Sequence, residues 1–174
     1  KFEGWEHMGG GISQAGSEFS ISDRHFVTRI LRPTLTTIYE VDKEKGWKFI
    51  TTNCVTRKMD DVSKVKPDFL NRAVIGILFQ EYKDGKNAKE AFEILADFVR
   101  MRKGIPWKAD LVFQELKGDY TDQQKWDLVK VSLDEFKNLP VNVFVEMIVS
   151  DLASKSEDKE LRKLATETIK FWAT

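Results

Sequence analysis

The chain has 174 residues, of which 41% are hydrophobic and 32% charged, and its 28 basic residues balance its 28 acidic ones. This size and composition support a packed core and exclude a disordered chain, while zero net charge excludes a long-range field that attracts polyanions or anionic membranes. Cys54 is the single cysteine, so no intrachain disulfide can form, and we expect a cytoplasmic location.

Residues 1–17 predict a flexible N-terminal arm. The segment has no sustained hydrophobic period and contains three consecutive glycines at 9–11, which leave the backbone free and supply no side chain for packing. Its aromatic and apolar side chains are the natural anchors for a partner. We predict that the arm binds a protein through Phe2, Trp5 and Met8.

The segment 34–56 predicts an antiparallel β-hairpin. Residues with β-branched side chains are frequent in it, and apolar side chains alternate with others on both sides of a charged turn at 42–46. A short helix or extended segment is expected before it, ending ahead of Pro33. One face of the first strand would carry Leu35, Thr37, Tyr39 and Val41.

After Pro67 the hydrophobic period becomes helical, and the region 67–173 predicts five or six helices. The pairs Thr121 with Gln124 and Ser154 with Glu157 have the spacing of a capping box, which marks a helix start. Helices are therefore expected at 67–83, from Asn87 to Gly104, at 107–116, from Thr121 onward, after Pro140 and from Ser154 onward.

Together these elements predict an α+β fold, with a small antiparallel sheet packed on a helical bundle in a single domain at 18–174. The longest apolar run, at 141–152, is too short for a bilayer, so no membrane span is expected. Within this run Asn142, Glu146 and Ser150 recur at the spacing of one helix side. We expect this polar stripe to face solvent or a partner.

No catalytic residue, metal site or cofactor is predicted. Cys54 and His25 have the chemistry of a thiolate–imidazole pair, but Cys54 lies in a pattern where a small core residue is ordinary. With two histidines and one cysteine, a zinc site would need several carboxylates at spacings that the chain does not show.

One segment combines positive charge with an aromatic side chain. Cations near a helix C-terminus have a structural reason to be there, because they interact favourably with the helix dipole. The functional interpretation is a contact with single-stranded nucleic acid, whose phosphates attract cations and whose bases stack on aromatic rings. The residues of this basic cluster are Arg100, Arg102, Lys103, Trp107 and Lys108.

The leading hypothesis is a non-enzymatic protein-interaction or self-assembly module that uses the arm and helical surfaces, with a homo-oligomer expected. One alternative is a nucleic-acid-binding protein of nucleocapsid or regulatory type, viral or otherwise, acting through the basic cluster. A second alternative is a small-ligand binder or enzyme with a site between the hairpin and the helices. That site would be lined by Tyr39, Trp47, Phe49 and Cys54.

Overall fold

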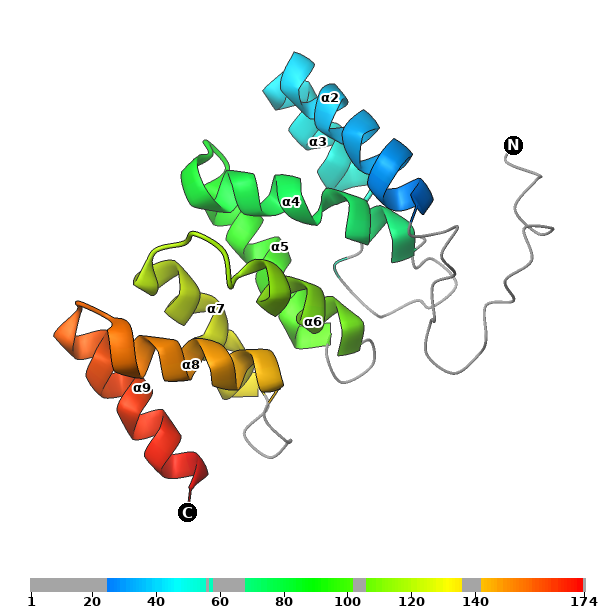
Figure 1. Cartoon of the computed structure of the whole chain (residues 1–174). Helices are drawn as coiled ribbons and strands as arrows, with labels where there is room; N and C mark the ends of the chain where they lie inside the picture. The colour runs from blue at the N-terminus through cyan, green and yellow to red at the C-terminus, as the bar shows by residue number, and fades with distance from the viewer. Residues whose placement is uncertain (1–24, 56, 58–67, 102–105, 136–141, 174) are drawn as a thin grey trace. The chain divides into compact units, whose positions relative to one another are not determined.

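The computed structural model describes residues 25–55, 57, 68–101, 106–135 and 142–173. Every regular element within these ranges is helical (Figure 1), so the predicted α+β fold is wrong. The predicted helical part is confirmed where the structure describes it. In chain order the elements are η1 (Val27–Leu31, a π-helical turn), α2 (Arg32–Val41), α3 (Lys43–Asn53), α4 (Asp68–Asp84), α5 (Ala88–Arg100), α6 (Pro106–Glu115), α7 (Asp122–Glu135), α8 (Val143–Lys155) and α9 (Lys159–Trp172).

The internal contacts of the chain divide it into two compact units. Among the described residues, the first unit comprises 25–54 and 68–74, and the second comprises 55, 57, 75–101, 106–135 and 142–173. Helix α4 therefore begins in the first unit and ends in the second. The predicted single domain at 18–174 stays a prediction.

In the first unit, α2 and α3 form a helical hairpin where a β-hairpin was predicted. Leu35 and Tyr39 are buried, as expected for positions one helical turn apart, whereas Thr37 and Val41 are exposed. A strand would place all four on one face, because its side chains alternate with a period of two. The observed burial therefore follows the helical period, and the hairpin prediction at 34–56 is wrong.

Two of the threonines of α2 form hydrogen bonds with the carbonyls of the preceding helical turn. The hydroxyl of Thr34 donates to the carbonyl of Ile30 (2.7 Å), and that of Thr37 donates to the carbonyl of Pro33 (3.0 Å). Thr can adopt the helix rotamer that allows this bond, which satisfies its hydroxyl without leaving the helix. β-branched content was therefore a misleading strand signal here.

The sequence suggested that the segment before Pro33 ends ahead of the proline, but the helix continues through it. The N–H of Arg32 donates to the carbonyl of Val27, so the turn before the proline has the wider π-helical bonding. Pro33 then occupies the first turn of α2, where a missing N–H is tolerated. The change of hydrogen-bonding pattern at this point lets the helix continue past the proline.

The charged turn predicted at 42–46 is instead the start of α3. Asp42 has an extended backbone and caps the helix by accepting from the N–H of Lys45 (3.0 Å). That hydrogen bond, assisted by the Lys45 side chain, holds the pKa of Asp42 below its usual range. Gly46 is buried, and an added Cβ would lie 2.5 Å from Tyr39 Cα. It is needed because the two helix backbones approach closely here.

The second unit is a stack of helical hairpins in which α5, α6 and α7 each contact the helix two places further along. Contacts join α5 with α7, α6 with α8, and α7 with α9, in addition to contacts between neighbours such as α8 and α9. Successive hairpins therefore cover one another, as in solenoid proteins. Its largest fully buried side chains include Phe79, Phe98, Phe113, Ile94, Leu95, Leu116 and Leu128.

The helix starts of this unit test the predicted caps. Thr121 and Gln124 form the predicted capping box: the N–H of Gln124 donates to Thr121 Oγ1 (3.1 Å), and the N–H of Thr121 donates to Gln124 Oε1 (3.0 Å). The box predicted from Ser154 and Glu157 is wrong. Helix α9 is capped by Asp158, which accepts from two backbone N–H groups of the first turn.

Two glycine substitutions should have opposite effects on stability. Gly46→Ala places a methyl group against the backbone of α2, so we expect the free energy of unfolding to fall by about 1–3 kcal/mol. Gly76→Ala lies in an exposed turn of α4 with nothing within 4 Å of the new methyl, and should raise it by about 0.5–1 kcal/mol. Urea unfolding followed by circular dichroism measures both.

Equal effects of the two alanines would contradict the close approach of α2 and α3. Native-state hydrogen exchange locates the change, because Gly46→Ala should increase exchange chiefly in α2 and α3.

Candidate functional site

The arm residues Phe2, Trp5 and Met8 lie outside the described residues, as do Arg102 and Lys103 of the basic cluster. Trp107 belongs to the first turn of α6. The side chains of Arg100 and Lys108 have the surroundings described next.

Arg100, at the end of α5, is surrounded by carboxylates. Its guanidinium lies 3.0 Å from Asp97, 3.7 Å from Glu135 and 3.9 Å from Glu93. Asp97 also accepts from Nε of Arg57 (2.7 Å). The positive charge of Arg100 is thus balanced locally, which weakens its attraction for phosphate.

Lys108 is fully buried in α6, contrary to its expected role as an exposed cation. Its Nζ lies 4.8 Å from the centroid of the Phe98 ring and 3.5 Å from Met101 Sδ. Cation–π contacts of this kind keep a charged amine stable beside an aromatic face. Lys108 therefore cannot reach a phosphate while the helices remain packed.

The residues that carry catalytic chemistry do not converge in the described parts of the chain. Cys54 is buried at the end of α3, and His25 is exposed ahead of η1. Tyr39 and Trp47, expected to line a ligand site, are buried core residues, and Phe49 is exposed. Among the described residues, no three His, Cys, Asp or Glu side chains are grouped so that they could hold a metal ion. None of the helices in these ranges combines the length and hydropathy needed to cross a bilayer.

A hydrogen-bonded junction joins the end of α4 to the start of α7. The Tyr82 hydroxyl donates to the carbonyl of Gln124 (2.9 Å), and the Gln124 amide donates to the carbonyls of Tyr82 (3.4 Å) and Lys83 (3.3 Å). Burial, with a smaller contribution from Asp127, raises the pKa of Tyr82 well above its usual range. The same glutamine that caps α7 thus fixes the tyrosine.

Beside this junction lies a depression between α5 and α7, which we name the α5–α7 hollow, with a volume of about 490 Å³. The rings of Tyr82 and Phe92 lie 5.8 Å apart and supply an aromatic wall. Val131 faces it from α7. Charges of both signs complete the lining, so the hollow is lined by Tyr82, Ala88, Lys89, Phe92, Asp127, Lys130, Val131 and Asp134.

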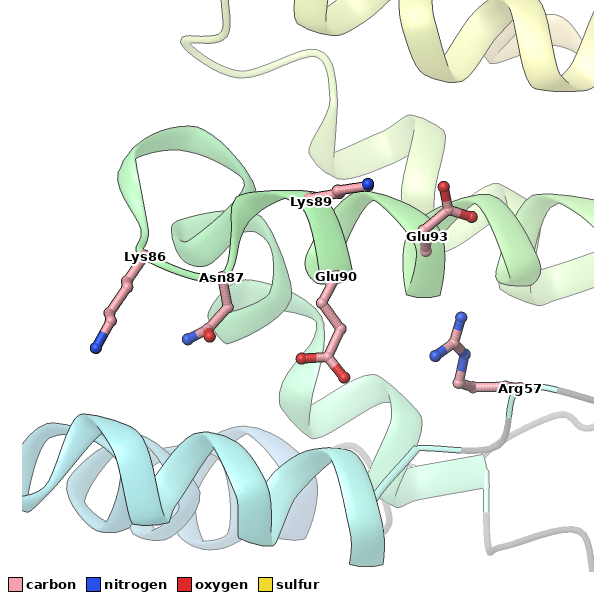
Figure 2. A pocket seen from close by; sticks show the side chains of 6 residues that line it. All are labelled: Arg57, Lys86, Asn87, Lys89, Glu90 and Glu93. Carbon is pink, nitrogen blue, oxygen red and sulfur yellow. The ribbon is translucent and has the colours of Figure 1, made fainter.

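A second depression of about 410 Å³, which we name the Arg57 hollow, lies at the start of α5. Figure 2 shows the Arg57 guanidinium on the same side of α5 as the Glu90 carboxylate, whereas the Glu93 carboxylate and the Lys86 side chain extend away from it. Lys89 lines both hollows, so they flank the exposed side of α5. The Arg57 hollow is polar, which suits it to salt bridges at the edge of an interface better than to enclosing a ligand.

Sequence reasoning did not identify either hollow. The signal for the first was present in part, because Phe92 and Tyr82 were placed in predicted helices, but their proximity depends on how α4, α5 and α7 meet. Comparison of the chain with protein-family models, curated proteins and solved structures gave no match.

The hydrogen bond of Tyr82 at this junction should make the free energy of unfolding fall at alkaline pH. A raised folded-state pKa means that Tyr82 contributes stability below its unfolded pKa near 10.0, and that this contribution is lost as the pH rises through the folded value. Tyr82→Phe should therefore lower the free energy of unfolding at neutral pH by about 0.5–1.5 kcal/mol, through the lost hydrogen bond, and flatten its alkaline decline. Urea unfolding over a pH series measures both effects.

Tyr120→Phe is the matched control, because burial also raises the pKa of Tyr120, to about 12, but its hydroxyl does not hold Gln124. A Tyr82→Phe variant with unchanged neutral stability and an unchanged pH slope would show that the junction contributes nothing.

Proposed function

We propose that the chain is a non-enzymatic protein-interaction module that binds a polypeptide across the exposed sides of α5 and α7. The α5–α7 hollow carries this proposal. It combines the aromatic surface of Tyr82 and Phe92 with a rim of lysine and aspartate. Aromatic anchor sites with charged rims are typical of protein interfaces, where the apolar centre supplies affinity and the rim supplies register.

The helical stack supports this proposal. Stacks of hairpins present long, rigid surfaces on which one partner segment can contact several helices. The two hollows that share Lys89 extend the surface along α5 beyond a single depression. Exposed apolar side chains occur elsewhere in the unit too, such as Val143 and Met147, one turn apart on α8.

The partner we infer first is a second copy of the chain, with the arm as the inserted segment. The sequence places Phe2, Trp5 and Met8 in residues 1–17, and an aromatic anchor of this size suits a hollow of about 490 Å³. The basic-cluster alternative receives no comparable support, since Arg100 pairs with carboxylates and Lys108 is buried.

Native mass spectrometry of the full chain tests the proposal. We expect the wild type to form a discrete oligomer. The Phe92→Glu and Val131→Glu variants should be monomeric, since Phe92 lines the α5–α7 hollow from α5 and Val131 lines it from α7. Each introduces a charge into the apolar centre of the hollow and should weaken association by about tenfold or more, equivalent to about 1.4 kcal/mol. The double variant Phe2→Ala/Trp5→Ala should dissociate in the same way.

Lys163→Ala on α9 is the control, because this exposed residue lies outside both hollows. Circular dichroism confirms that each variant is folded. If the wild type is a monomer, peptides selected from a random display library identify a foreign partner, and their amide shifts should map to α5 and α7. A monomeric protein whose selected peptides bind elsewhere would refute the proposal.

A further inference from the structure

A separate cavity of about 340 Å³ is bounded by the end of α6, the start of α7 and one side of α8. We name it the α6–α8 cavity. Its lining includes the apolar side chains of Leu116, Ile148 and Leu152, which are buried, and Met147 adds a half-exposed side chain. The volume falls in the range of small-ligand sites, which are mostly apolar with a few polar groups.

The mouth of this cavity carries three lysines and two aspartates. The aspartates are already occupied: Asp151 lies 2.8 Å from Lys155 Nζ, and Asp122 accepts a hydrogen bond from the hydroxyl of the buried Ser156. Lys117 and Lys125 bring the lysines to three against two aspartates, so the lining carries one more positive than negative charge.

Lys117 is positioned by an aromatic ring. Its Nζ lies 4.4 Å from the centroid of the Phe144 ring, a cation–π contact that holds the amine beside this ring. Lys125 stands one turn into α7 and is half-buried. Partial burial strengthens its interaction with an incoming anion, since water screens it less.

We infer that the α6–α8 cavity binds a small organic anion with an aliphatic or aromatic body. The apolar body would contact Leu116, Ile148 and Leu152, and its carboxylate, sulfonate or phosphate group would lie at the mouth beside Lys117 and Lys125. A ligand of this kind would interact with both parts of the lining. A purely apolar ligand would form no ion pair with the lysines, and a bare anion would leave the apolar side chains in contact with water.

This site is independent of the proposed protein interface. None of its lining residues lines the α5–α7 hollow, although α7 contributes to both. Asp122 and Lys125 lie on one side of α7, and Lys130 and Asp134 lie roughly opposite by the helical period. A substitution at one site should therefore leave the other unchanged.

Fluorescence titration of the full chain tests the inference with two probes of nearly the same aromatic body. Anilinonaphthalene sulfonate is an anion, and phenylnaphthylamine is its neutral counterpart. We expect saturable binding of the anion at one site, weaker binding of the neutral probe, and a loss of anion affinity as salt is added.

Lys125→Glu should lower the affinity for the anionic probe by about tenfold, because it replaces an attraction by a repulsion. The affinity for the neutral probe should stay unchanged. Met147→Ala should lower the affinity for both probes, and the exposed position of Met147 limits any effect on folding. Lys163→Glu on α9 changes the same charge away from the cavity and should change neither titration.

The inference is overturned if anion binding does not saturate, if Lys125→Glu and Lys163→Glu bind the anion equally, or if the amides shifted by the probe lie outside α6, α7 and α8. Phe92→Glu separates this result from the proposed protein interface. The variant should bind the anion as the wild type does, whatever its state of association.

Discussion

The second unit depends on one constraint, which is that a helical hairpin leaves apolar side chains uncovered until another hairpin packs on it. Helix α5 shows this directly. Its consecutive residues Ile94, Leu95 and Ala96 point in three directions, and all three are buried. A single neighbour cannot cover them, and α6 and α7 both contact α5. The contacts between helices two places apart follow from this need, and they stack the hairpins in order.

The same constraint produces both surface sites. Neighbouring helices meet along their buried sides and separate toward solvent, so a depression forms wherever two outer sides diverge. Helix α7 contacts α5, α8 and α9, and it supplies residues to a depression on each of two opposite sides. The Gln124 junction fixes where its first turn begins, since one side chain both caps α7 and binds the end of α4. The geometry of both sites is therefore linked to this junction.

The sequence predicted the fold only where local signals agreed with tertiary packing. For the helices after Pro67 and for the Thr121 capping box, the local signals and the tertiary packing agree, so these elements were predicted correctly. The segment 34–56 conflicts, because its β-branched residues and two-residue alternation favour a strand. The spacing of Trp47, Ile50 and Cys54 is helical and was the better signal, since all three are buried. Gly46 was predicted to lie in a turn, because the close contact between two helices that requires a glycine here cannot be recognised from neighbouring residues.

The sites were harder to predict because they join residues far apart in the chain. Lys108 carried the right charge for a nucleic-acid contact, yet its burial against Phe98 depends on how α5 and α6 pack. Zero overall charge removes only the long-range field, whereas screening limits an exposed charge to about 8–10 Å. Local imbalance, such as three lysines against two engaged aspartates, therefore determines what a cavity of this size attracts.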